Sequence, residues 1–119
     1  MKYALLIHWD EKGGSVDQEH NRELIRQCYL HTKEMAAEGV FLHGSPLSLT
    51  PTAKTLRIRN GERMVSDGPY AETKEQFGGY QLLECESREQ AIEKTREVLA
   101  VQQNTAGGVE LHELDEDAV

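Results

Sequence analysis

The run Tyr3–Ile7, with the sequence YALLI, is apolar at every position and constrains the fold more than any other stretch. Side chains of a β-strand alternate between the two faces of a sheet, so this strand is apolar on both faces. Such a strand must lie in the centre of a sheet and be covered above and below. Leu82 and Leu83 place the same requirement on a later strand, which we expect over residues 77–86.

Two segments have the spacing of amphipathic helices. The first runs from about residue 17 to 38, and side chains at helical spacing predict its buried stripe: Ile25, Cys28, Tyr29, Thr32, Met35 and Ala36. Ser87 and Gln90 form a capping-box pattern that opens a second helix, which ends near Gln102. The side chains expected on its buried face are Ala91, Ile92, Thr95, Val98 and Leu99.

Three further strands complete the expected elements. Residues 40–47 form one strand, which Pro46 and Pro51 end or place at a sheet edge, and residues 109–114 form the last. Residues 53–68 predict a hairpin, because Leu56, Ile58 and Met64 alternate with charged residues around a strong type I′ turn signal, Asn60-Gly61.

The order of these elements is β-α-β, then the hairpin, then β-α-β. With the hairpin as an insertion, this predicts an α+β fold of the ferredoxin-like split βαβ type, as a single domain over residues 1–119. Both helices then cover one face of an antiparallel sheet. The other face would expose several large side chains, at roughly 1.5–3 kcal/mol each.

The uncovered face predicts a homodimer through the sheet, which is a dimeric α+β barrel with a pocket beside the sheet face. The alternative cover is the inserted hairpin of the same chain, folded back over the sheet. Either cover would remove the exposed side chains from water.

Composition excludes some functions and favours a location. The formal net charge of the chain is −8, and an acidic protein lacks the basic surface that nucleic-acid binding needs, so we expect no nucleic-acid partner. The apolar run near the N-terminus is too short for a signal segment or a membrane span. We therefore expect a cytoplasmic protein with no membrane association, and Cys28 and Cys85 as reduced, structural thiols.

The stretch DGPYAETKEQFGGY, from Asp67 to Tyr80, resembles the signature of the DGPF (DGPFAETKE) proteins, a branch of the YCII-related superfamily. The likeness continues in MKYALLI, TAKTLRIRNGERMVSDGP and GGYQLLEC. The chain departs from the family pattern at Tyr70, where phenylalanine is usual, and at His8-Trp9, which could change the chemistry of the pocket.

The resemblance implies a ferredoxin-like fold and a dimeric barrel, but it does not specify a reaction. Distant relatives include small-molecule lyases and isomerases of the dehydrochlorinase-like and muconolactone-isomerase-like kinds. Members of the branch are often encoded beside extracytoplasmic-function sigma factors, which suggests a regulatory setting.

Candidate catalytic residues are His8, at the end of the first strand, and Asp67 and Glu72, in the motif. A histidine titrates near neutral pH, and a carboxyl group with a raised pKa can transfer protons. Each has a structural alternative. Asp67 can cap a turn, Glu72 can lie on a solvated turn, and His8 can be a partly exposed ring.

Candidate substrate-binding residues are Lys74, Tyr80 and Gly79. Lys74 could attract an anion, and Tyr80 could offer its hydroxyl to a pocket or be an ordinary core residue. The Gly78-Gly79 pair either lets a ligand or a backbone approach closely or forms a β-bulge.

No close pair of histidines or cysteines has metal-ligand spacing, and no nucleotide-binding motif is present, so we expect no metal and no cofactor. Two hypotheses follow. One is a cofactor-independent lyase or isomerase acting by general acid/base catalysis on a small organic acid. The other is a non-catalytic ligand sensor or partner-binding protein linked to sigma-factor-type transcriptional regulation.

Overall fold

The computed structural model describes residues 1–10, 18–48, 50–71, 75–102 and 107–118, and its main elements are six strands and two helices. The strands are β1 (Lys2–Trp9), β2 (Phe41–Pro46), β3 (Lys54–Arg59), β4 (Glu62–Asp67), β5 (Gln76–Glu84) and β6 (Gly107–Glu113). The helices are α1 (Gln18–Ala37) and α2 (Arg88–Val101), with short 3₁₀ turns at Thr50–Thr52 and Glu116–Ala118. The protein is therefore α+β, as the sequence predicts.

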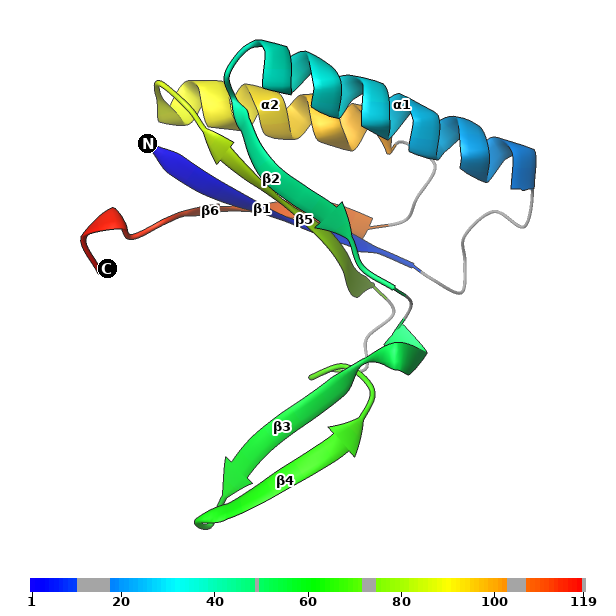
Figure 1. Cartoon of the computed structure of the whole chain (residues 1–119), viewed down its shortest axis with the longest axis vertical. Coiled ribbons are helices and arrows are strands. Elements are labelled where there is room, and N and C mark those ends of the chain that lie inside the picture. Colours follow the sequence, from blue (N-terminus) through cyan, green and yellow to red (C-terminus); the bar gives the residue numbers. More distant parts are fainter. Residues whose placement is uncertain (11–17, 49, 72–74, 103–106, 119) are drawn as a thin grey trace.

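Four strands form one antiparallel sheet in the order β2-β5-β1-β6, so the two strands with apolar residues on both faces lie in its centre. Both helices pack on the same face of this sheet (Figure 1). The core lies in that layer, where Tyr3, Leu5 and Ile7 of β1 meet Met35 of α1 and Leu83 of β5.

The opposite face, which we call the open face, carries the alternate side chains of the central strands. They are Ala4, Leu6 and His8 of β1 and Tyr80 and Leu82 of β5, all partly exposed. Phe77 of β5, which pairs with His8 on this face, is 40% exposed. Apolar surface thus remains in contact with water on this face.

Strands β3 and β4 form a separate two-stranded sheet, residues 54–67, which we call the arm. Asn60 and Gly61 at its tip have φ angles of 53° and 80°, the positive values that a type I′ turn requires. The arm stands away from the four-stranded sheet (Figure 1). Within one chain it therefore does not cover the open face, which was the alternative that the sequence left open.

The boundaries of both helices and the capping box of Ser87 and Gln90 agree with the sequence prediction. Ser87 accepts a hydrogen bond from the amide of Gln90 at 3.1 Å, and the Gln90 side chain accepts one from the amide of Glu86 at 2.7 Å. No helix within the described ranges is both long and apolar enough to cross a membrane.

The predicted buried stripes of the helices are only partly correct. In α1, Met35 is buried, but Ile25 and Tyr29 are 69% and 59% exposed, and Ala36 is exposed too. In α2, Ile92 and Leu99 are exposed, whereas Lys94 is 8% exposed. Helical spacing identifies which side chains share one face of a helix, but it does not show how much of that face the sheet covers.

Candidate functional site

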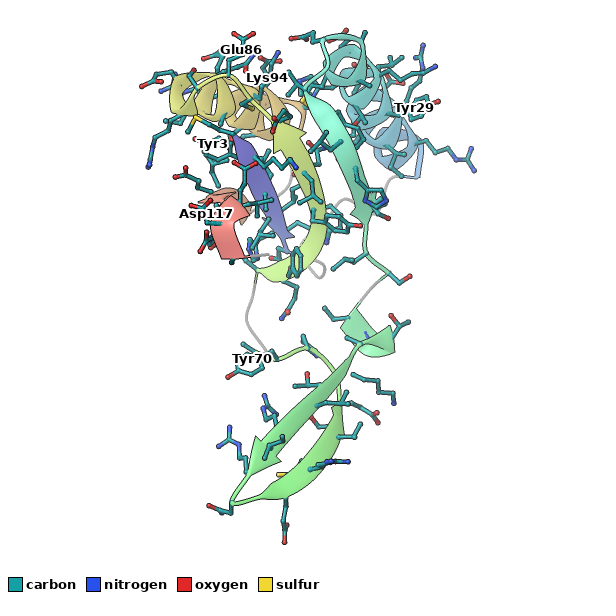
Figure 2. All side chains as sticks on the ribbon, turned by 60° about the vertical axis from the view of Figure 1, so that its left-hand side comes forward. Tyr3, Tyr29, Tyr70, Glu86, Lys94 and Asp117 are labelled. Atoms are coloured by element: carbon teal, nitrogen blue, oxygen red, sulfur yellow. The ribbon has the colours of Figure 1, made fainter. Side chains whose placement is uncertain are left out.

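A cleft of about 330 Å³ opens between α1 and the helix-facing side of the sheet. Apolar side chains make most of its wall: Ile7, Trp9, Leu24, Ile25, Tyr29 and Phe41. Tyr29 projects from α1 (Figure 2). Tyr29 and Ile25 are exposed because they border this cleft instead of packing against the sheet. An apolar hollow with a few polar groups is the usual form of a small-molecule site.

Gln81 of β5 is the most informative polar group in the wall. Its position alternates with Gly79 and Leu83, so its side chain is on the helix-facing side of the sheet. Its Oε1 atom is buried and has no hydrogen-bond partner among the described residues. Leaving a buried acceptor unpaired costs about 1–3 kcal/mol, so a ligand that hydrogen-bonds there would recover this cost.

The floor of the cleft is shaped by glycines. The register of β1 with β5 pairs Ile7 with Gly79 and His8 with Phe77, which leaves Gly78 as the extra residue of a β-bulge. A Cβ atom on Gly78 would lie 2.2 Å from the Trp9 ring. The bulge interpretation of the glycine pair is therefore confirmed, and it makes room for the indole at the mouth of the cleft.

Gly79 lines the cleft, and residue Tyr80 borders it, although strand alternation directs the Tyr80 side chain to the open face. A Cβ on Gly79 would lie 3.3 Å from the carbonyl oxygen of Ser45, so this glycine allows β2 to approach closely. The Tyr80 hydroxyl is hydrogen-bonded to Nδ1 of His43 at 3.0 Å, and the two rings stack. Tyr80 is thus engaged by a neighbouring strand on the open face.

His8 lies on the open face, away from the cleft. Its Nε2 is 2.8 Å from Oε1 of Glu110 on β6, although the ring is not aligned for a hydrogen bond. Glu110 also contacts His112, with 3.0 Å between Oε2 and Nε2. The hydrogen bond from His112, together with the charges of both histidines, lowers the pKa of Glu110 despite partial desolvation. Phe77 packs against the His8 ring at 5.7 Å.

Asp67 is at the end of the arm, where it is 84% exposed and forms an ion pair with Lys54. It does not lie beside His8 or in the cleft. Glu72 and Lys74 lie outside the described residues. The structure therefore brings Gly79 to the cleft, places His8 and the Tyr80 side chain on the opposite face of the sheet, and separates Asp67 from both.

A family model for the YCII-related domain matches residues 1–114. The chain belongs to the YCII-related family. An uncharacterized protein from Rhizobium meliloti (strain 1021) is 34% identical over 99 residues, which cover 82% of this chain and 80% of that protein. Neither match specifies a ligand or a reaction, so the function of this YCII-related protein has to be argued from its own site.

Sequence reasoning missed Gln81 and Glu110, and it singled out Trp9 only together with His8, as a departure from the family pattern. A signal existed for Gln81, because a polar residue at the helix-facing position beside Leu83 interrupts an apolar alternation. For Glu110 no local signal exists. Its approach to His8 depends on the pairing of β1 with β6, whose residues are about a hundred positions apart in the chain.

Proposed function

We propose that this YCII-related protein binds a small, largely apolar organic molecule in the cleft between α1 and the sheet. The unpaired amide oxygen of Gln81 in an apolar hollow carries this proposal. The amide can rotate by 180° and present its NH₂ group instead, so the position can serve a donor or an acceptor on the ligand. The ligand then combines an apolar body with one polar group.

The chemistry of the cleft favours binding over catalysis. Among the described residues that line it, none is a carboxylate or a histidine. Cys28 lies in the wall, but burial raises the pKa of its thiol, so it is protonated at neutral pH and a poor nucleophile. A non-catalytic ligand sensor agrees with these properties. The DGPYAETKE motif supports placing the protein in the DGPF branch, whose gene setting supports a link to sigma-factor-type regulation.

The proposed assembly is a homodimer through the open face. The strand order β2-β5-β1-β6 with both helices on one face supports the ferredoxin-like split βαβ arrangement. The partly exposed Leu6 and Leu82, with Phe77 at 40% exposure, support a second copy as the cover of the open face, giving a dimeric α+β barrel.

The second candidate function is acid/base catalysis inside that barrel, and the cluster of His8, Glu110 and His112 favours it. A carboxylate beside an imidazole can orient the ring and stabilise its charged form while it takes a proton from a small organic acid. No cofactor is needed for such a lyase or isomerase. In this candidate His8→Ala abolishes turnover, while ligand affinity in the cleft is unchanged.

Trp9 provides the test, because it is the single tryptophan of the chain and lines the cleft. The purified protein is titrated with a panel of small aromatic and aliphatic acids and amides while its fluorescence is followed. We expect saturable binding of at least one compound and a loss of affinity of at least about tenfold in Gln81→Leu, because the amide is then unavailable.

Gln27→Leu is the matched control, since Gln27 lies on the exposed surface of α1, where its side-chain amide donates a hydrogen bond to Glu23. It should bind like the wild type. Absence of saturable binding across the panel, or equal affinity in Gln81→Leu, would contradict the proposal.

A further inference from the structure

The arm exposes an apolar strip made of Leu56, Ile58 and Val65. Leu56 pairs directly with Val65, and Ile58 lies two residues along the same strand, so all three share one face. They are 73%, 74% and 68% exposed. An isolated two-stranded hairpin is marginal in water, and a projecting strip of large apolar side chains indicates a contact surface.

The arm also differs in charge from the rest of the chain. Residues 54–67 hold four of the 13 basic residues and two of the 21 acidic ones, which gives them a formal charge of +2 and leaves −10 on the remainder. Arg63 pairs with Ile58 and therefore lies on the strip face. The arm is thus complementary to the body of this same protein.

The surface area points to a second copy as well. The chain exposes 8645 Å², whereas a compact monomer of this mass exposes roughly 6500 Å². Its radius of gyration is 16.0 Å, against about 13.5 Å expected for a compact chain of this length. The excess of roughly 2000 Å² exceeds the roughly 800 Å² per partner that a stable complex buries.

The direction of the arm fits the proposed dimer. The arm projects on the side of the sheet opposite the helices (Figure 1), and Tyr70 lies at its end nearer the sheet (Figure 2). A second copy seated on the open face would therefore lie beside the arm.

We propose that each arm clasps the body of the second copy through the strip of Leu56, Ile58 and Val65, with Arg63 against its acidic surface. This inference rests on the homodimer proposed above. The clasp gives the inserted hairpin a second contact between the copies, in addition to the contact between the two open faces.

Sedimentation velocity over a range of concentrations tests the clasp in the full chain. The arm variant is Leu56→Thr/Ile58→Thr, which places a β-branched side chain with high strand propensity at both positions but removes the apolar strip. The matched control is Met64→Thr, because Met64 is 49% exposed on the other face of the arm. A third protein, Leu82→Lys, disrupts the open face.

We expect the arm variant to raise the dimer Kd at least tenfold, the control to stay within about twofold, and Leu82→Lys to dissociate the dimer. A charge variant, Arg63→Glu, should weaken the dimer most at low salt, since exposed charges are screened at high salt. This variant keeps the test valid if the threonine substitutions unfold the arm.

The outcomes separate the two proposals. A wild-type protein that is monomeric at tens of micromolar overturns both the homodimer and the clasp. If Leu82→Lys dissociates the dimer while the arm variant and Arg63→Glu match the wild type, the homodimer stands and the clasp is wrong. Equal weakening by Met64→Thr also refutes the clasp, because it removes the dependence on one face of the arm.

Discussion

Gly78→Ala should destabilise the protein by displacing Trp9 from its place beside the bulge. A Cβ on Gly78 would lie 2.2, 2.5 and 2.6 Å from three atoms of the indole, whereas ordinary contacts begin at 3.4 Å. The ring must therefore move by roughly 1 Å or rotate, and the cleft that it lines changes shape.

The magnitude follows from two opposing terms. Overpacking of this kind costs about 1–3 kcal/mol, while replacing glycine by alanine stabilises by about 0.4–1 kcal/mol through the unfolded chain. We expect a net loss of about 1–2 kcal/mol in the free energy of unfolding. For a domain of this size, that lowers Tm by roughly 4–8 °C.

Urea and thermal unfolding followed by Trp9 fluorescence measure both effects at once. Gly108→Ala is the matched control, since Gly108 lies on β6 opposite His8 and a Cβ there meets nothing within 4 Å. It should be neutral or slightly stabilising. If Gly78→Ala matched this control in stability and left the emission of Trp9 unchanged, the role given to the bulge would be wrong.

Three further predictions concern the helices. Ser87→Ala should lose about 1 kcal/mol in chemical denaturation, because the side chain caps α2. Lys94→Met should lose about 1–2 kcal/mol at neutral pH, since Lys94 contacts Glu38 at 2.7 Å and Glu97 at 3.5 Å, and the exposure of the acids moderates the effect. The hydrogen bond with Glu38 raises the pKa of Lys94 above its ordinary value of 10.5. The stabilisation by Lys94 should therefore be fully present below pH 10.5 and disappear as pH rises through the pKa of Lys94 in the folded protein. Burial acts to raise the pKa of Glu97, but the hydrogen bond with His31 and the charge of Lys94 outweigh it, so the folded-state pKa lies below the ordinary 4.5. Wild-type Glu97 therefore contributes stability that is lost as pH falls through this lowered pKa, and Glu97→Gln should lose less stability over the same pH range. A Glu97→Gln protein with the wild-type acid profile would contradict this last point.

Much of the fold could be predicted because its signals are local. Asn60-Gly61 requires positive φ at two consecutive positions, and Ser87 with Gln90 satisfies the first amides of a helix, so both features follow from a few neighbouring residues. The apolar run Tyr3–Ile7 places β1 in the centre of the sheet without any knowledge of its neighbours.

The site was harder to predict because it depends on contacts between distant segments. Helical spacing predicts Ile25 and Tyr29 as buried, but a cleft between α1 and the sheet leaves them exposed. The clustering of charged residues around Asp67 suggests a catalytic loop, yet the arm holds Asp67 away from the cleft, paired with Lys54. Local chemistry identified reactive residue types, and tertiary structure decided which of them meet.

The central claim is that a ligand occupies the cleft and engages Gln81. The most direct measurement is the NMR signal of the Gln81 side-chain amide in ¹⁵N-labelled protein, assigned by its absence in Gln81→Leu. We predict that this signal shifts on addition of a compound that changes Trp9 fluorescence, while the amide signal of Gln27 on the outer surface of α1 stays in place. A compound that binds and shifts the signals of the open face, but leaves the Gln81 amide unmoved, would contradict the claim.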